Sequence, residues 1–164
     1  MWGDGSLPQM GDYDLDIYAW SQRQGALLRR LAAGERVNGS DLDWPNIAEE
    51  IETVGRSERR AIASHLANII EHLMKLEASP AVDRRPGWRM TIERSRIEIE
   101  ALLDDSPSLK SQVDELIVGE LPRARRLASA ALAEHHEAPR VDVQSLIYSG
   151  HQVLGDWVPD DNGR

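Results

Sequence analysis

One stretch, from residue 43 to residue 79, constrains the fold more than any other part of the chain. Its apolar residues recur at steps of three and four positions, the spacing that places side chains on one face of an α-helix; they are Ile62, Leu66, Ile69, Ile70, Leu73 and Leu76. Asp43 and Pro45 form a typical helix start, and Pro80 marks the end. Gly55 interrupts the stretch, and because glycine disfavours helix interiors we expect either a kinked helix or two helices that meet there.

Three polar side chains lie on or beside this apolar face, namely Glu58, His65 and His72. Glu58 falls in the middle of the apolar arc and the two histidines fall at its edge. Because an unpaired carboxylate is costly to bury, Glu58 needs a partner, and Arg96 on the apolar face of a later predicted helix is the natural candidate. The pair is either a catalytic carboxylate held by a guanidinium or a structural ion pair that sets helix register, and we favour the ion pair.

Composition excludes several classes of protein. The chain has 164 residues, of which 41% are hydrophobic, enough for one domain with a sizeable core. It contains no cysteine, which excludes disulfides, thiol catalysis and cysteine-ligated zinc. No apolar run is long enough to span a bilayer and no signal-peptide pattern opens the chain, so we expect a cytoplasmic protein without membrane contact. The net charge of −9 argues against a nucleic-acid partner.

The rest of the chain predicts an all-α fold, an up-down helical bundle of four to five helices with a kinked or broken central helix. Besides the central stretch, apolar periodicity predicts helices over residues 13–33, 88–103 and 107–137, and no strand pattern occurs. Residues 1–12 are rich in glycine and lack periodicity, so we expect a flexible N-terminal arm. We expect residues 13–149 to form a single bundle domain and residues 150–164 to form a loose C-terminal tail.

Four blocks of the sequence resemble motifs of a known family: residues 14–20 (DLDIYAW), 47–60 (IAEEIETVGRSERR), 72–75 (HLMK) and 106–109 (SPSL). Trp88 and Arg96 match positions that follow the third block, and Ala124 and Arg125 match positions that follow the fourth. Together these residues resemble the bacterial domain of unknown function family 29. The resemblance implies an all-helical fold and no assigned activity. The chain departs from the family pattern at Leu121, where tyrosine is usual.

Three carboxylates near the start of the central stretch are candidates for metal binding or catalysis, namely Glu49, Glu50 and Glu52. Glu49 and Glu52 are three positions apart and share a helix face, as in the Glu-x-x-Glu half-motif of all-α nucleotide pyrophosphohydrolases. Such carboxylates hold Mg²⁺ or Mn²⁺, which then binds phosphate oxygens. A complete site needs a second acidic pair, for which Glu100 and Asp104 are mis-spaced substitutes. The alternative is that these charges only favour the helix dipole.

The two histidines of the central stretch are also candidates for metal binding. Seven helical residues separate His65 from His72, about 10.5 Å along the axis, which is too far for both to bind one ion directly. A metal site would therefore need ligands from other helices, such as Glu49 or Glu50. We favour the alternative that both histidines are ordinary residues at the boundary of the core.

Two functions of different classes follow from these patterns. We expect a non-enzymatic protein-interaction module that self-associates as a homo-oligomer and needs no cofactor, because the apolar and tryptophan-rich helix faces exceed what one small bundle buries. The alternative is a Mg²⁺- or Mn²⁺-dependent hydrolase of a phosphate-containing small molecule. The catalytic candidates are Glu50, Glu58, His65, His72 and Arg96. If their side chains converged in an open pocket, that would favour the enzyme.

Overall fold

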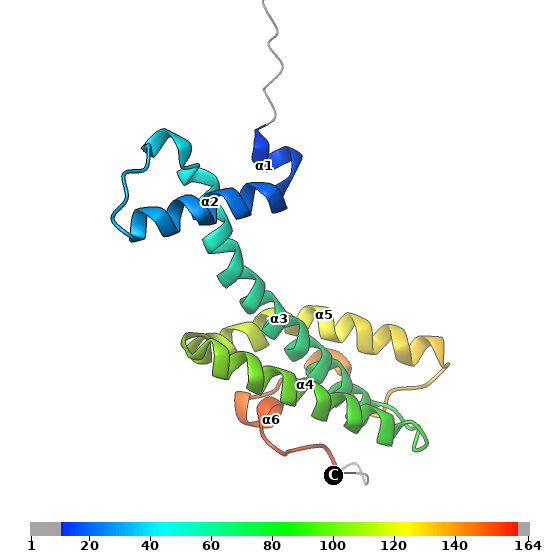
Figure 1. The fold of residues 1–164 in the computed structure, drawn as a ribbon. Helices are drawn as coiled ribbons and strands as arrows, with labels where there is room; N and C mark the ends of the chain where they lie inside the picture. Colours follow the sequence, from blue (N-terminus) through cyan, green and yellow to red (C-terminus); the bar gives the residue numbers. More distant parts are fainter. Residues whose placement is uncertain (1–10, 161–164) are drawn as a thin grey trace, which may run out of the picture. The chain divides into compact units, whose positions relative to one another are not determined.

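The computed structural model describes residues 11–160, so most of the expected N-terminal arm lies outside the described residues. The described residues form helices without a strand, which confirms the predicted all-α fold (Figure 1). No described helix is long and apolar enough to cross a membrane. The elements in chain order are α1 (Asp12–Leu15), α2 (Ile17–Ala32), η1 (Gly39–Asp41), α3 (Trp44–Ala78), α4 (Arg85–Asp105), η2 (Pro107–Gln112), α5 (Val113–Glu134), η3 (Val143–Ser145) and α6 (Gly150–Leu154), where η denotes a 3-10 helix.

The chain divides into two compact units, unit 1 (Met1–Gly55) and unit 2 (Arg56–Arg164), whereas we expected one domain over residues 13–149. Helix α3 contributes residues to both units and runs for 35 residues without a break. The alternative in which two separate helices meet at Gly55 is therefore wrong. A single internal glycine costs a helix only about 1 kcal/mol relative to alanine, which the hydrogen bonds and packing of a long helix offset.

Unit 1 has a small apolar core. Trp20 of α2 packs with Leu42 and Ile47, and the ring of Tyr13 meets the edge of Trp20 with ring centroids 4.9 Å apart. The indole N–H of Trp20 donates to Asp43 Oδ2 at 3.1 Å. Two points of Trp20, its ring and its N–H, therefore join α2 to the start of α3.

Asp43 organises the start of α3, as the sequence predicted. Its carboxylate accepts a hydrogen bond from the Asn46 side chain at 2.7 Å and from the Asn46 backbone N–H at 3.5 Å. These bonds, together with the one from Trp20, hold the pKa of Asp43 below its ordinary value. Gln24, which is buried, accepts from the Asp43 backbone N–H at 3.0 Å and donates to the Asp41 carbonyl at 3.2 Å. The loop before α3 is thus tied to α2.

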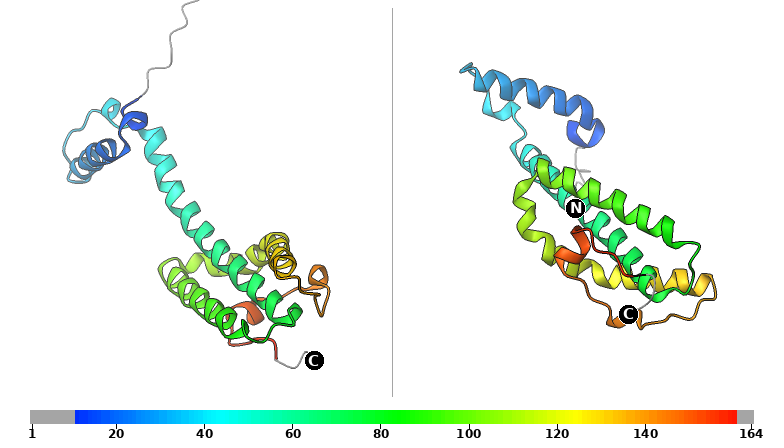
Figure 2. Two further views of the ribbon diagram at one scale, coloured as in Figure 1. Left: turned by 90° about the vertical axis from the view of Figure 1, so that its right-hand side faces the viewer. Right: turned by 90° about the horizontal axis from the view of Figure 1, so that it is seen from below.

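Unit 2 contains the main core, formed by the C-terminal part of α3 with α4 and α5 (Figure 2). The six apolar residues that the spacing placed on one face of α3 are all buried, with exposed fractions of 0–1%. Helix α4 adds Ile92 and Ile99, and α5 adds Leu116 and Ile117. The helical periodicity read from the sequence therefore located the core correctly.

The C-terminal segment, residues 146–160, differs from the loose tail that we expected from residue 150 onward. Val153 of α6 is fully buried, Tyr148 is 8% exposed, and Trp157 packs against the same core. Arginines of the helices donate to the backbone of this segment: Arg125 Nη2 bonds the Leu146 carbonyl at 2.8 Å. The prediction of a loose tail is therefore wrong for residues 150–160. Apolar side chains of the segment enter the core, whereas the arginine bonds go to main-chain carbonyls, which leave no side-chain pattern in the sequence.

Candidate functional site

Glu50 of α3 forms a hydrogen bond with α1. Its Oε1 accepts a short hydrogen bond from the Tyr13 hydroxyl. This bond, and the negative charge of Glu50, raise the pKa of Tyr13 to about 12, because both favour the protonated phenol. The two residues are 37 positions apart, and no local sequence pattern indicated that they would meet. The contact assigns Glu50 a positioning role within unit 1.

Glu49 and Glu52, the candidate metal ligands, are both exposed near the start of α3. The described residues contain no group of three or more histidine, aspartate or glutamate side chains placed to hold a metal ion. The second acidic pair that the half-motif needs is therefore not brought to them within residues 11–160. The first turn of α3 contains no acidic residue, so Glu49 and Glu52 also lie too far along the helix for the dipole interpretation to account for them.

The predicted ion pair between Glu58 and Arg96 does not form, and this prediction is wrong. Arg96 directs its guanidinium to the C-terminal segment: Nε donates to the Val153 carbonyl at 2.9 Å, and Nη2 donates to the carbonyls of Gln152 at 3.0 Å and Trp157 at 2.7 Å. Burial lowers the pKa of Arg96, and the nearby carboxylates of Glu93 and Asp156 oppose this shift. Arg96 therefore acts as a clamp for the C-terminal segment.

Glu58 itself is half-buried, as its place on the apolar face predicted. Its Oε2 atom is buried and accepts no hydrogen bond from any described residue. The next residue, Arg59, bonds Gln112 Oε1 at the end of η2 at 3.0 Å and Glu115 Oε1 in the first turn of α5 at 3.3 Å. Sequence reasoning thus located the buried carboxylate correctly and assigned it the wrong partner.

The two histidines take separate places in unit 2. His65 is half-buried. The Nδ1–H of His72 donates to the Asn68 carbonyl one turn earlier in α3, at 2.8 Å. Burial lowers the pKa of His72 and the positive charge of Lys75 lowers it further, while the Asn68 bond and Glu71 oppose the shift. Within unit 2, Glu58, His72 and Arg96 are therefore not joined in one site.

His72 predicts a dependence of stability on pH. Because its pKa in the folded protein lies below the ordinary value of 6.5, the unfolded chain binds a proton more readily than the folded one. The free energy of unfolding should therefore fall as pH drops below about 6.5. In the variant His72→Gln, whose amide also donates to a carbonyl, this fall should be smaller. Urea unfolding of both proteins between pH 7 and pH 5 measures the difference, and identical pH profiles would contradict the assignment.

A cluster of polar contacts at the end of α3 was not predicted from the sequence; it consists of Ser79, Arg84 and Glu137. Ser79 is fully buried, and its hydroxyl donates a short hydrogen bond to Glu137. Arg84 forms an ion pair with the same carboxylate and lies over the ring of Trp88, with its guanidinium carbon 5.5 Å from the ring centroid. Ser79 and Glu137 are 58 positions apart, so only the folded chain brings them together.

A hollow in unit 1 has a volume of about 710 Å³ and is open to solvent. Among its lining residues, Arg23 forms an ion pair with Asp12 at 2.7 Å, and Gln24 is occupied by the loop before α3. Neither Glu49 nor Glu52 lines it. Polar groups that line this hollow already bond one another, and none of the catalytic candidates is among its lining residues.

Comparison with known proteins identifies the family but no activity. No curated protein and no solved structure matches the chain. One family model, described as domain of unknown function DUF29, matches residues 13–157, a range that includes α6 and Trp157 as well as the blocks noted in the sequence. Because this match covers most of the chain, the protein belongs to the DUF29 family of domains of unknown function.

Proposed function

We propose that the protein is a non-enzymatic interaction module that self-associates through an apolar surface of unit 1. The observation that carries this proposal is an imbalance among the described residues of unit 1. Three hydrophobic residues are buried there, whereas seven large ones are 42–74% exposed. These seven form what we call the unit 1 apolar surface: Leu15, Ile17, Tyr18, Leu31, Trp44, Ile51 and Val54. Exposed apolar residues mark protein-binding surfaces where they lie side by side.

The centre of the unit 1 apolar surface lies on α3. Ile51 and Val54 follow the buried Ile47 by four and seven positions, so all three lie on one face of the helix. Ile47 is 8% exposed because α2 covers it, but Ile51 and Val54 are 69% and 65% exposed. The bond between Tyr13 and Glu50 holds α1, with the exposed Leu15, beside this part of α3. The apolar face of α3 that is buried at Ile47 therefore continues to Ile51 and Val54, where no other part of unit 1 covers it.

A second copy of the chain is the proposed partner. A two-fold contact brings the same patch of both copies together, so an apolar patch is complementary to itself. Burying apolar area is favourable by roughly 25 cal/mol per Å², and helix faces with residues at steps of three and four pack readily against each other. The metal-dependent hydrolase has no comparable support, because no described group supplies the additional ligands that Glu49 and Glu52 would need.

Sedimentation velocity over a range of concentrations tests the proposal. We expect the native protein to self-associate. We expect the double variant Ile51→Lys, Val54→Lys to raise the dissociation constant by about 100-fold, because two charges would enter the centre of the contact. The matched control is Val118→Lys, Ile147→Lys, which changes two residues of unit 2 that are 66% and 73% exposed. A native protein that stays monomeric at the highest soluble concentration, or equal effects of both double variants, would overturn the proposal.

A further inference from the structure

The outer side of α4 carries alternating apolar and acidic residues. Met90 and Ile97 are 53% and 56% exposed and lie seven positions apart, so they share one side of the helix. Glu93, Glu100 and Asp104 follow Met90 by three, ten and fourteen positions, which places them along the same side. The stripe runs for about 21 Å at the helical rise per residue. It lies opposite the face of α4 that enters the core of unit 2.

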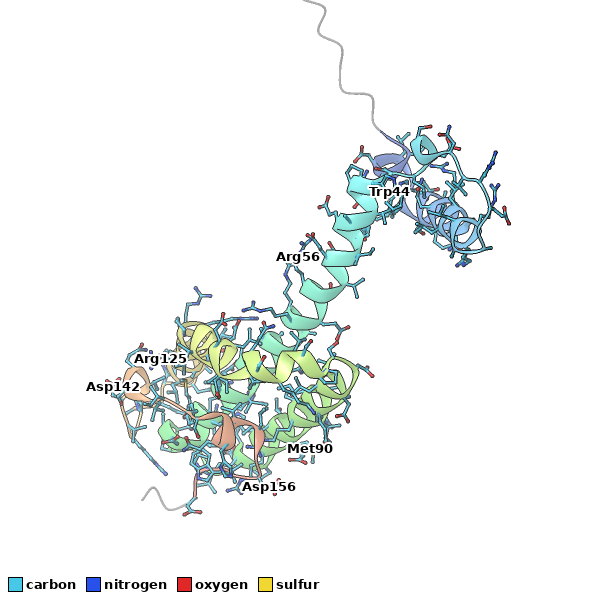
Figure 3. All side chains as sticks on the ribbon, turned by 90° about the vertical axis from the view of Figure 1, so that its left-hand side faces the viewer. Trp44, Arg56, Met90, Arg125, Asp142 and Asp156 are labelled. Carbon is cyan, nitrogen blue, oxygen red and sulfur yellow. The ribbon has the colours of Figure 1, made fainter. Side chains whose placement is uncertain are left out.

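The C-terminal segment forms a second wall beside this stripe. Two adjoining hollows with volumes of about 410 and 400 Å³ lie between α4 and the segment, and both are lined by Arg96 and Asp156. Met90 and Asp156 mark this side of unit 2 in Figure 3. Leu154 and Val158 supply apolar lining from the segment. The carbonyl bonds of Arg96 hold this wall in place, so the groove is formed before any partner binds.

The larger hollow of the groove is predominantly acidic. Its charged lining consists of four carboxylates and two cations, Glu93, Glu100, Asp104, Asp156, Arg96 and Lys110. Among the described residues, none of the four carboxylates forms an ion pair within contact distance. The Nε and Nη2 atoms of Arg96 donate to backbone carbonyls and not to these carboxylates. The charges of Glu100 and Asp104 are therefore available to a partner, whereas those of Glu93 and Asp156 already interact electrostatically with Arg96.

The spacing of the carboxylates decides between an ion and an extended partner. No three of the described histidine, aspartate and glutamate side chains lie close enough to hold a metal ion. The acidic groups are instead spread along the helix, with Ile97 between Glu93 and Glu100. Such a row repels phosphates and other anions, and it complements cations that are spaced along a rod with an apolar side.

We infer that this groove of unit 2 binds a cationic amphipathic helix of another protein. The apolar side of that helix covers Met90 and Ile97, and its lysine or arginine side chains reach the carboxylates of α4 and Asp156. About 14 residues of partner helix match the length of the stripe. This heterotypic contact uses other residues than the unit 1 apolar surface and does not depend on self-association.

A designed peptide provides the probe. It is an amidated helix of about 15 residues built from Leu, Ala and Lys, with leucines at steps of three and four and lysines flanking them, and a fluorescent label for anisotropy. We expect it to bind the native protein, and we expect the variant Glu100→Gln, Asp104→Asn to weaken binding about tenfold by removing two of the four charges. The matched control is Glu98→Gln, Asp105→Asn, because both residues are exposed on α4 but line neither hollow.

Three results would overturn the inference. One is the absence of binding between the lysine peptide and the native protein. Another is equal weakening by the groove variant and the control variant, which would show general attraction to a chain of net charge −9. The third is equal binding of a peptide in which glutamate replaces every lysine. Circular dichroism of both variants checks that the exposed amide substitutions leave the helices intact, so that a change in affinity reports on the groove.

Discussion

Replacing Arg96 with alanine should lower the free energy of unfolding by roughly 3 kcal/mol. Its guanidinium bonds the carbonyls of Gln152, Val153 and Trp157, and a truncated side chain would leave these three acceptors without their charged donor. The substitution should also make the C-terminal segment more mobile, because the bonds from Arg96 hold this segment, with the buried side chain of Val153, against the core. Urea unfolding measures the stability, and hydrogen exchange measures the protection of residues 146–160.

Two further variants separate the clamp from general effects of charge. Arg94→Ala removes an exposed arginine from the same helix and should change stability by at most about 0.5 kcal/mol. Arg96→Lys keeps the positive charge but loses the planar fork that reaches several carbonyls, so it should recover only part of the stability. A loss after Arg94→Ala as large as after Arg96→Ala would refute the clamp, and so would complete recovery in Arg96→Lys.

Replacing Trp20 with alanine should destabilise unit 1 by about 3–5 kcal/mol, the range for truncating a buried tryptophan. Trp20 is 4% exposed, and it is the largest of the three buried hydrophobic residues in the described part of unit 1, where the other two are Leu42 and Ile47. The indole N–H also bonds Asp43, whose pairing organises the start of α3. Because unit 1 has so little other core, we expect it to unfold locally.

Hydrogen exchange followed by mass spectrometry distinguishes local from global unfolding. In Trp20→Ala, amides of residues 12–50 should lose protection, while those of α4 and α5 in unit 2 should keep it. Gln22→Ala is the control, because this residue is exposed on the same helix, lies outside the unit 1 apolar surface, and should leave the exchange pattern of unit 1 close to native. Equal loss of protection in both units would instead mean that the chain unfolds as one cooperative block.

Glu58 shows how far the sequence carries a prediction about a site. Its position on the apolar face was readable from spacing, and its Oε2 is indeed buried. Its partner could not be predicted. Opposite charge suggested Arg96, but in the folded chain the Arg96 guanidinium bonds backbone carbonyls of the C-terminal segment. A carbonyl can be supplied by any residue type, so a bond from arginine to the backbone leaves no trace in residue identity.

Glu50 and Ser79 illustrate a second limit. Glu50 was named as a candidate catalytic residue, yet it bonds Tyr13, and Ser79 was not singled out at all although it bonds Glu137. Both contacts join residues far apart in the chain. A polar residue that is held for structural reasons and one that is held for catalysis look alike in sequence, because both are defined by partners that only folding supplies.

The sequence by itself determined that the chain is helical, where its long helices lie and which face of α3 enters the core, because helix formation and its apolar period depend on neighbours three and four residues away. It also carried the motifs of the DUF29 family. Only the tertiary structure decided that the chain divides near Gly55, that the C-terminal segment packs against the core, and which groups receive the arginines. These features depend on contacts between distant segments, and their energies are set by distance and burial in the folded chain.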